Sequence, residues 1–349
     1  MYTREILAPR GSPVENGTPL AGTWNRAFSH VNLLDIQRPY RWPFPHWLLN
    51  YRIKEWEGFS IQNDIFSLEA FLGNFKLCRM AQVILYNKEN GEIYFIRRLL
   101  PGGGWKMPRN LAHGSVECHS SRFFLRIHTW LNADTVDVDI DIAATRKQPP
   151  ITARLAFAMD SREVTPAVVS LKFDEQRSMY AYKALTAVRG DIVLGRDHFN
   201  MNPAQCTGIF WDYKGFFPYP MRTFYCGGSG FDEEGRRFGF HIAENQAKET
   251  RKNNENALWL DGRFTPLPPV RITMSERPES DWVIQDLDGM VDLVFTPGKN
   301  NRFNTNFFAV RTDFFSSIGY YNGSLVNENG ENIKVQNLWG NGKKLYLRV

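Results

Sequence analysis

The feature that most constrains the fold is a strict alternation of apolar and polar residues over Thr135–Ile142. Successive side chains of a β-strand point to opposite faces of its sheet, so this pattern predicts a strand with one buried and one solvated face. The apolar positions are Val136, Val138, Ile140 and Ile142, and the acidic ones are Asp137, Asp139 and Asp141. A flat row of carboxylates cannot easily surround a cation, so we expect a solvated face here and no metal site.

Shorter strand-like runs recur along the chain, at 81–86, 93–96, 123–127, 167–173, 238–242, 291–295 and 307–311. Turn signals that end in glycine separate several of them, at 87–91, 232–235 and 327–330, where a tight reversal requires a positive φ. Only 178–189 has a helical pattern, and no long amphipathic segment of period 3.6 occurs. The sequence therefore predicts an all-β protein whose strands are mostly antiparallel.

Length, charge and hydropathy narrow the class of protein. The chain has 349 residues, which corresponds to about two domains of roughly 150 residues each. Its net charge of +5 comes without a basic cluster, which argues against a nucleic-acid partner. No run approaches the roughly 18 apolar residues of a membrane helix, and the first residues lack an apolar leader, so we expect a cytoplasmic protein with no integral membrane segment.

The cysteines and the domain division lead to two further expectations. Cys78, Cys118, Cys206 and Cys226 are widely spaced with no C-x-x-C pair, which predicts free thiols in a reducing compartment. A differently patterned, aromatic-rich half follows 185–201. We therefore predict an N-terminal domain over 1–190 and a C-terminal domain over 191–349, with a boundary placed to within about ten residues.

The second half gathers aromatic residues with a few polar ones, the composition of a pocket for an apolar ligand. His241 is the strongest catalytic candidate, as a proton donor or acceptor, with Asp212 or Glu255 orienting it. The ligand-binding candidates are Trp211, Tyr219, Arg222, Tyr225, Glu244 and Trp259. Each of these residues also suits a purely structural role. His241 and Glu244 are three residues apart and so point to opposite faces of a strand. The seven histidines lack metal-ligand spacing and no nucleotide motif occurs, so we expect neither a metal nor a cofactor.

Four elements of the second half occur in a characteristic order: Trp211–Gly215, Arg237–Phe240, Glu255–Gly262 and Val291–Pro297. Together with the early Gly22–Arg26, they resemble domain-of-unknown-function family 2804 over most of the chain. The resemblance implies a relation to the lipocalin-like clan of carotenoid 1,2-hydratase and hydroxyneurosporene-synthase-type proteins. It implies two β-rich domains, the first β-sandwich-like and the second a lipocalin-like barrel. Members of the clan with known roles handle isoprenoid or polyketide-like molecules, and several fungal relatives catalyse cyclisation.

Three functions remain open from the sequence. The first is binding of an apolar isoprenoid- or lipid-like molecule, with its hydration, isomerisation or cyclisation as the possible reaction. The second is a non-catalytic lipid or pigment carrier, favoured because 337–344 lacks the acid and histidine with which the family resembled usually closes. The third is a carbohydrate-active β-sandwich, which requires two carboxyl groups roughly 5–10 Å apart across a groove.

Overall fold

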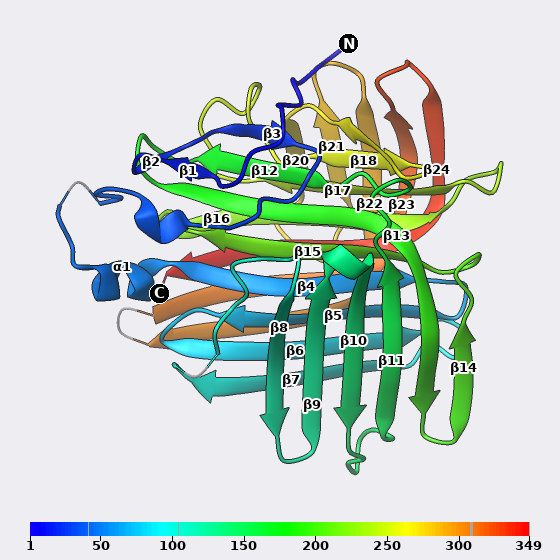
Figure 1. Ribbon diagram of the computed structural model, residues 1–349. Coiled ribbons are helices and arrows are strands. Elements are labelled where there is room, and N and C mark those ends of the chain that lie inside the picture. Colours follow the sequence, from blue (N-terminus) through cyan, green and yellow to red (C-terminus); the bar gives the residue numbers. More distant parts are fainter. Residues whose placement is uncertain (41, 104, 308–309, 349) are drawn as a thin grey trace.

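The computed structural model describes residues 1–40, 42–103, 105–307 and 310–348. Nearly all of the regular structure consists of antiparallel strands in two large sheets (Figure 1). The all-β prediction is confirmed. The small elements outside these sheets are β1 (Val14–Glu15), β2 (Thr18–Pro19), the 3₁₀ turns Leu33–Asp35 and Leu131–Ala133, and α1 (His46–Arg52).

The first sheet contains thirteen strands. Its main path runs β7 (Ile93–Pro101), β6 (Cys78–Asn87), β5 (Phe66–Asn74), β4 (Lys54–Gln62), β15 (Thr207–Gly215), β13 (Ser178–Leu194), β11 (Ile151–Ala158), β10 (Thr135–Ile142), β9 (Phe123–Trp130) and β8 (Gly114–Ser120). The strands β12 (Ala167–Lys172), β3 (Gly22–Trp24) and β14 (Asp197–Met201) pair off this path.

The second sheet contains nine strands. Its order is β19 (Arg263–Pro266), β18 (Ala257–Leu260), β17 (Arg237–Glu244), β16 (Met221–Phe231), β24 (Asn332–Arg348), β23 (Val310–Val326), β22 (Val291–Phe307), β21 (Trp282–Asp286) and β20 (Val270–Met274). The change from one sheet to the other falls between Gly215 and Met221, and residue 190 lies inside β13. The domain division itself stays a prediction.

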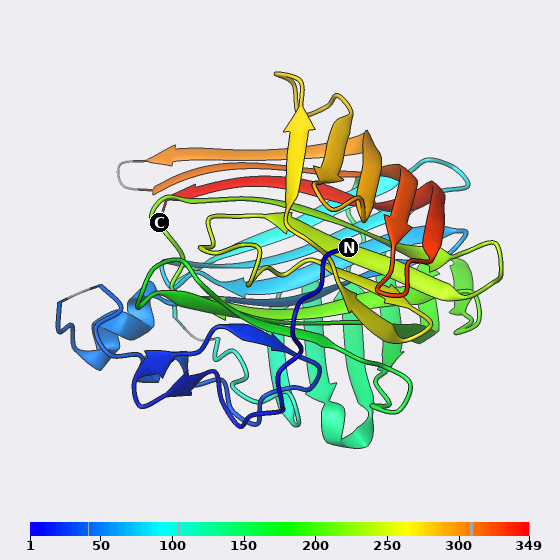
Figure 2. The same ribbon diagram turned by 90° about the horizontal axis from the view of Figure 1, so that it is seen from above.

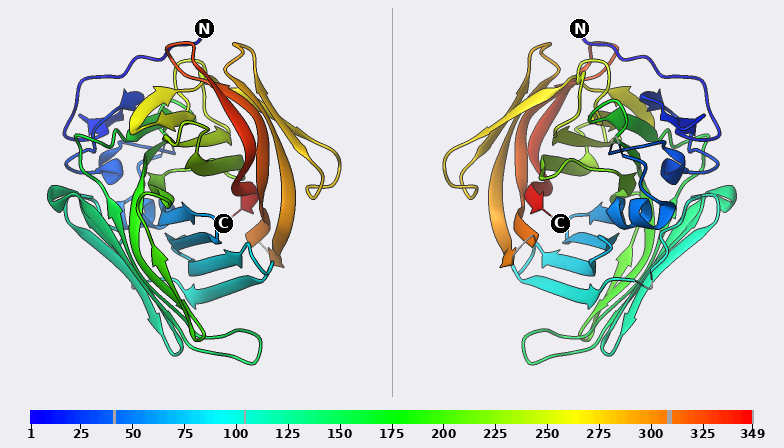
Figure 3. Two further views of the ribbon diagram at one scale, coloured as in Figure 1. Left: turned by 90° about the vertical axis from the view of Figure 1, so that its right-hand side faces the viewer. Right: turned by 90° about the vertical axis from the view of Figure 1, so that its left-hand side faces the viewer.

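The strands form three layers, because the first sheet folds over on itself. Strands β8–β11 form one outer layer, β4–β7 with β15 the middle layer, and β21–β24 the other outer layer (Figure 3). Figure 2 shows β22–β24 lying alongside β4–β7. The main core fills the space between the first two layers, and a second core lies within the curled second sheet. The middle layer thus has a different environment on each face.

The alternating segment forms β10 as predicted. Its four apolar side chains are buried at 1% exposure or less, and it pairs with β9 and β11 over its full length. The glycine turns are also confirmed, with positive φ at Gly91, Gly235 and Gly330. The first six of the shorter strand-like runs lie, in sequence order, in β6, β7, β9, β12, β17 and β22. In the last predicted run, 307–311, residues 308 and 309 lie outside the described residues.

The helical expectation for 178–189 is wrong, since this segment belongs to β13. Tyr180 and Tyr182 pack into the main core, while Ala181 packs on the opposite face, toward the second sheet. A strand buried on both faces carries no polar alternation, so its period cannot be told from that of a helix.

The structure also shows the state of the cysteines and the length of the helices. All four cysteines are free, three of them buried and Cys78 half-buried. In the described part of the chain, no helix combines the length and the hydropathy required to cross a membrane.

Candidate functional site

Strand β15 places alternate side chains on the two faces of the middle layer. It pairs with β13 on one side and β4 on the other, which fixes its register in the centre of the first sheet. Trp211 and Tyr213 therefore face the second sheet, and Asp212 and Lys214 face the opposite way. The candidate site lies on the side of Trp211 and Tyr213.

A cavity of about 340 Å³ separates the middle layer from β22–β24. Its described lining comes from both sheets and is almost entirely apolar, with Lys343 as its one charged residue. The lining residues are Trp56, Phe71, Phe75, Cys78, Met80, Leu99, Trp211, Met221, Tyr225, Phe303, Thr305, Thr312, Phe314, Lys343, Leu345 and Leu347. This composition suits an apolar ligand, and we call this space the apolar chamber.

A second, smaller space of about 60 Å³ adjoins the apolar chamber, and we call it the polar chamber. Trp56, Trp211, Tyr225 and Lys343 line both spaces. Tyr213 and His241 line only the polar chamber. Stacking of Trp56 on Tyr213, with ring centroids 5.0 Å apart, fixes the position of the phenol. A ligand in the apolar chamber would thus have its end next to a hydroxyl and an imidazole.

A buried ion pair lies behind the polar chamber. Lys183 Nζ donates to Glu255 Oε2 at 2.6 Å, and both side chains are at most 1% exposed. Tyr213 donates its hydroxyl proton to the same oxygen at 2.7 Å, and Asn245 donates to Oε1 at 2.8 Å. Each carboxylate oxygen therefore has a partner, as a buried charge requires.

The loop that carries Glu255 is held by its two neighbours in sequence. Asn254 Oδ1 accepts from the backbone N–H of Asn256, and Asn256 Nδ2 donates to Pro268 O. Asn256 Oδ1 also accepts from the backbone N–H of Ala243 in β17. These bonds tie Glu255 to the strand that carries His241.

His241 joins the network through one ring nitrogen. Its Nε2 lies 3.2 Å from the Tyr213 hydroxyl and 3.5 Å from Glu255 Oε2. Because Tyr213 gives its own proton to Glu255, its oxygen is an acceptor, and this assigns the imidazole proton to Nε2. Among the described residues nothing hydrogen-bonds to Nδ1, and the side chain remains 13% exposed in the polar chamber.

Burial and neighbouring charges set the protonation states. Burial first, and then the charge of the Lys183 ammonium, lower the pKa of His241 to about 4 against the opposing effect of Glu255, so the imidazole is neutral near neutral pH. Burial alone would raise the pKa of Glu255, but Lys183 and His241 together hold it well below its usual value. Burial and the Glu255 charge raise the pKa of the Tyr213 phenol well above its usual value. The resting site therefore combines a neutral base, a neutral hydroxyl and a buried ion pair.

The structure brings four of the nine residues predicted from sequence to this place. His241 and Glu255 are in contact, and Trp211 and Tyr225 line both chambers. Asp212 lies on the opposite face of β15, where Lys214 pairs with it, so it does not orient His241.

The other four predicted residues lie away from the chambers. Glu244 accepts from Arg271 and from the backbone N–H of Ile272. Arg222 lies over the Tyr346 ring, and Tyr219 is 48% exposed with Arg52 over its ring. Trp259 is fully buried and donates to Thr165 O, so it holds the second sheet against the β12 side of the first.

Sequence reasoning missed Lys183, Tyr213 and Lys343 as members of the site. Lys183 lies inside the segment read as a helix, but a single lysine within an otherwise apolar run was a usable signal, because a fully buried lysine requires a partner. Lys343 pairs with Glu69 at 2.8 Å and lies over the Trp211 ring, contacts that no local pattern encodes. Within the described residues, no cluster of metal-ligating side chains occurs.

Solved structures with similar folds are CghA and kievitone hydratase. The structure of CghA with Sch210972 has a TM-score of 0.53 at 11% identity, covering 85% of this chain and 88% of that one. A second structure of CghA has a TM-score of 0.54 at 12% identity and covers 85% of this chain and 88% of that one. The structure of kievitone hydratase from Nectria haematococca has a TM-score of 0.52 at 10% identity and covers 84% of this chain and 88% of that one. At these identities the likeness concerns the fold.

The amino-acid sequence identifies the family. No curated protein matches the chain. The profile of one family, described as a domain of unknown function, DUF2804, matches residues 2–347, nearly the whole chain. The chain belongs to the DUF2804 family.

Proposed function

We propose that this protein binds an apolar isoprenoid- or lipid-like molecule between its two sheets and catalyses a cofactor-independent proton transfer on it, a hydration or an isomerisation. The observation that carries the proposal is the position of His241, whose Nδ1 has no hydrogen-bond partner among the described residues, in a polar chamber that adjoins an apolar one. The name of kievitone hydratase, a structural neighbour, supports this class of reaction.

The residues of the polar chamber have separate roles in the proposed reaction. His241 Nδ1 takes a proton from a carbon of the substrate, or from a water whose oxygen bonds to one carbon of a polarised double bond. The imidazolium that forms is stabilised by the Glu255 carboxylate, 3.5 Å from Nε2. It then returns the proton to a different carbon, which completes an isomerisation or a hydration with atoms and charge balanced. Lys343, which lines both chambers, stabilises the negative charge that develops on the substrate.

The carbohydrate alternative is disfavoured by the lining. Among the described residues that line the two chambers there is no carboxylate, whereas a glycosidase requires a facing pair. The carrier alternative shares the apolar chamber and differs only in the absence of turnover, so the experiment must separate these two.

The test begins with extraction of the purified protein with organic solvent and mass spectrometry of the extract. The recovered molecule is then incubated with the protein in D₂O. We expect deuterium incorporation or a hydrated product, with the rate reduced about a hundredfold or more in His241→Gln. His119→Gln, at an exposed position, should keep the rate of the wild type.

Two results would count against the proposal. A ligand that returns unaltered and without deuterium would identify a carrier. Undiminished turnover in His241→Gln would remove the imidazole from the mechanism. Binding is checked separately with all-trans-retinol as an apolar probe, which Leu345→Trp should exclude by filling the apolar chamber.

A further inference from the structure

A second cavity lies on the other face of the middle layer, and it shares no described lining residue with the apolar chamber or the polar chamber. Its volume is about 630 Å³, within the range of small-molecule sites. We infer that this cavity binds a small organic anion, a carboxylate or a phosphate ester that carries an aromatic ring. We call it the basic cavity.

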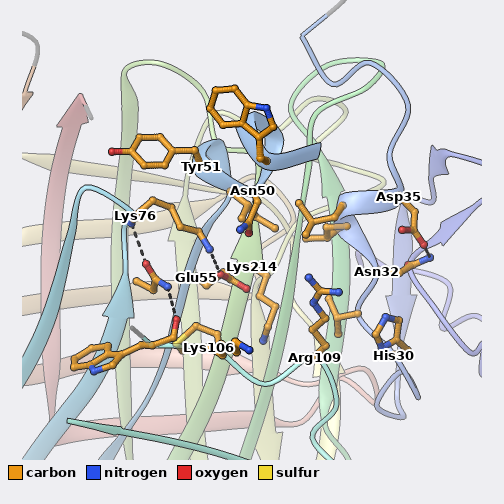
Figure 4. A pocket seen from close by; sticks show the side chains of 18 of the residues that line it. His30, Asn32, Asp35, Asn50, Tyr51, Glu55, Lys76, Lys106, Arg109 and Lys214 are labelled. Carbon is orange, nitrogen blue, oxygen red and sulfur yellow. Dashed lines mark hydrogen bonds and ion pairs between the residues drawn. The ribbon is translucent and has the colours of Figure 1, made fainter. Parts of the chain in front are cut away.

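The walls of the basic cavity come from segments far apart in the sequence. They are residues 30–35, α1, the start of β4, the β7–β8 loop and Lys214 of β15 (Figure 4). Backbone bonding fixes the loop in place, since Val31 N donates to Arg109 O at 2.8 Å. Asn74 Nδ2 donates to Trp105 O at 2.9 Å and ties the same loop to β5. The cavity is therefore built by tertiary contacts on several sides.

Cationic groups outnumber anionic ones around this cavity. Lys76, Lys106, Arg109 and Lys214 line it, against Asp35 and Glu55. Lys76 pairs with Glu55, and Asp35 accepts from Asn32. Among the described residues, neither Lys106 nor Arg109 has an ion-pair partner, and in Figure 4 their side chains lie around the same cavity as Lys214. Two cations are thus available to an anionic group, and Arg109 offers the paired donors that match carboxylate and phosphate oxygens.

The buried groups behind Lys214 add hydrogen-bond capacity that the protein leaves unused. Lys214 is 1% exposed, pairs with Asp212 and lies over the Tyr180 ring. Glu57 is paired in register with Asp212 on the neighbouring strand. Both Glu57 carboxyl oxygens and the Tyr180 hydroxyl are fully buried and have no hydrogen-bond partner among the residues that the structure describes. Burial and the neighbouring Asp212 raise the pKa of Glu57 well above its usual value, against the opposing charge of Lys214, which favours the neutral, proton-donating form of its carboxyl. Such unsatisfied groups are costly, which fits a bound polar group nearby.

Aromatic rings accompany the cations. Trp47, Tyr51 and Trp105 line the cavity, and Trp47 is 72% exposed while Tyr51 is 44% exposed. Exposed rings of this size at the edge of a cavity provide stacking surfaces for another planar group. The ligand therefore combines an anionic end near Lys106 and Arg109 with an aromatic portion.

Calorimetric titration with three naphthalene probes tests this inference. The probes are 2-naphthoate, 1-naphthyl phosphate and the neutral 2-naphthalenemethanol. We expect at least one anion to bind wild-type protein about tenfold or more tightly than the neutral probe. The double variant Lys106→Ala/Arg109→Ala should lose about tenfold of that affinity. Whichever of the two anions binds with the higher affinity indicates whether a carboxylate or a phosphate is preferred.

Two matched controls place the binding at this cavity. Arg146→Ala/Lys147→Ala removes the same charge from an exposed turn and should leave the affinity unchanged. Leu345→Trp fills the apolar chamber and should also leave it unchanged. Equal affinity for neutral and anionic probes, no binding of either anion at millimolar concentration, or an unaltered affinity in the Lys106/Arg109 double variant would each overturn the inference.

Discussion

His241 shows how the protonation of one residue depends on where the chain places it. Its imidazole is held neutral by burial and by the Lys183 ammonium, although a carboxylate lies 3.5 Å away. Glu255 does not outweigh these effects because its charge is already compensated by Lys183 at 2.6 Å. The ion pair therefore serves to position the network and leaves the base unprotonated.

This residue makes stability depend on pH in a defined direction. The folded protein has a pKa of about 4 for His241, below the ordinary value of 6.5, so between these values the unfolded chain binds the proton and the folded one does not. The free energy of unfolding should therefore fall as pH falls through this window, with about 2 kcal/mol lost by pH ~5. Urea unfolding of His241→Gln should lack this dependence, and His119→Gln should retain it. Parallel curves for wild type and His241→Gln would refute the assignment.

At the scale of elements, some hairpin turns require a positive φ that favours glycine. Gly91, between β6 and β7, has a φ of +72°, and a Cβ there would meet no atom within 4 Å. Any cost of a side chain at this position is therefore conformational.

Gly91→Ala should lower the free energy of unfolding by about 1–2 kcal/mol, because alanine disfavours the left-handed region. Gly11→Ala is the matched control, since a Cβ at Gly11 also meets open space but its φ is not in that region. Chemical denaturation of both variants measures the difference. Equal stability of the two would show that the turn relaxes.

The elements also show how far the sequence could predict the molecule. Strand β10 was predictable because one face is solvated and the alternation is complete. Strand β13 was not, because its first nine residues are buried on both faces. The candidate site could be predicted only in part for the same reason. His241 and Glu255 were named from the sequence, but the ion pair of Glu255 with Lys183 of β13 depends on how the two sheets pack. Trp259 and Asp212 were misleading because aromatic and acidic residues also serve cores and ion pairs.

At the scale of the whole molecule, the first residues of the described chain join the two sheets. Ile6 and Leu7 pair with Thr23 of β3, in the first sheet. Tyr2 is 5% exposed within the core of the second sheet, where its hydroxyl donates to Arg251 O at 2.7 Å. The segment therefore acts as a strap across the molecule.

Tyr2→Ala should cost about 3 kcal/mol of unfolding free energy, because it leaves a cavity in the second core. Tyr2→Phe keeps the packing and should cost about 1 kcal/mol for the lost hydrogen bond. Tyr51→Ala, at a half-exposed ring, serves as the control. In thermal and urea unfolding, Tyr2→Ala should be the least stable variant and Tyr2→Phe should lie between it and the wild type. A Tyr2→Ala protein as stable as the wild type would contradict the role of the segment as a strap.

The alternation along β15 has an evolutionary consequence. Tyr213 faces the polar chamber and Lys214 the basic cavity, so one strand supplies both compartments from adjacent positions. Insertion or deletion of a single residue at the start of the strand would exchange its faces, putting an ammonium beside His241 and a phenol beside Glu57. Related chains can thus change either compartment by point substitution independently of the other. A change in the length of β15, by contrast, would alter the polar chamber and the basic cavity together.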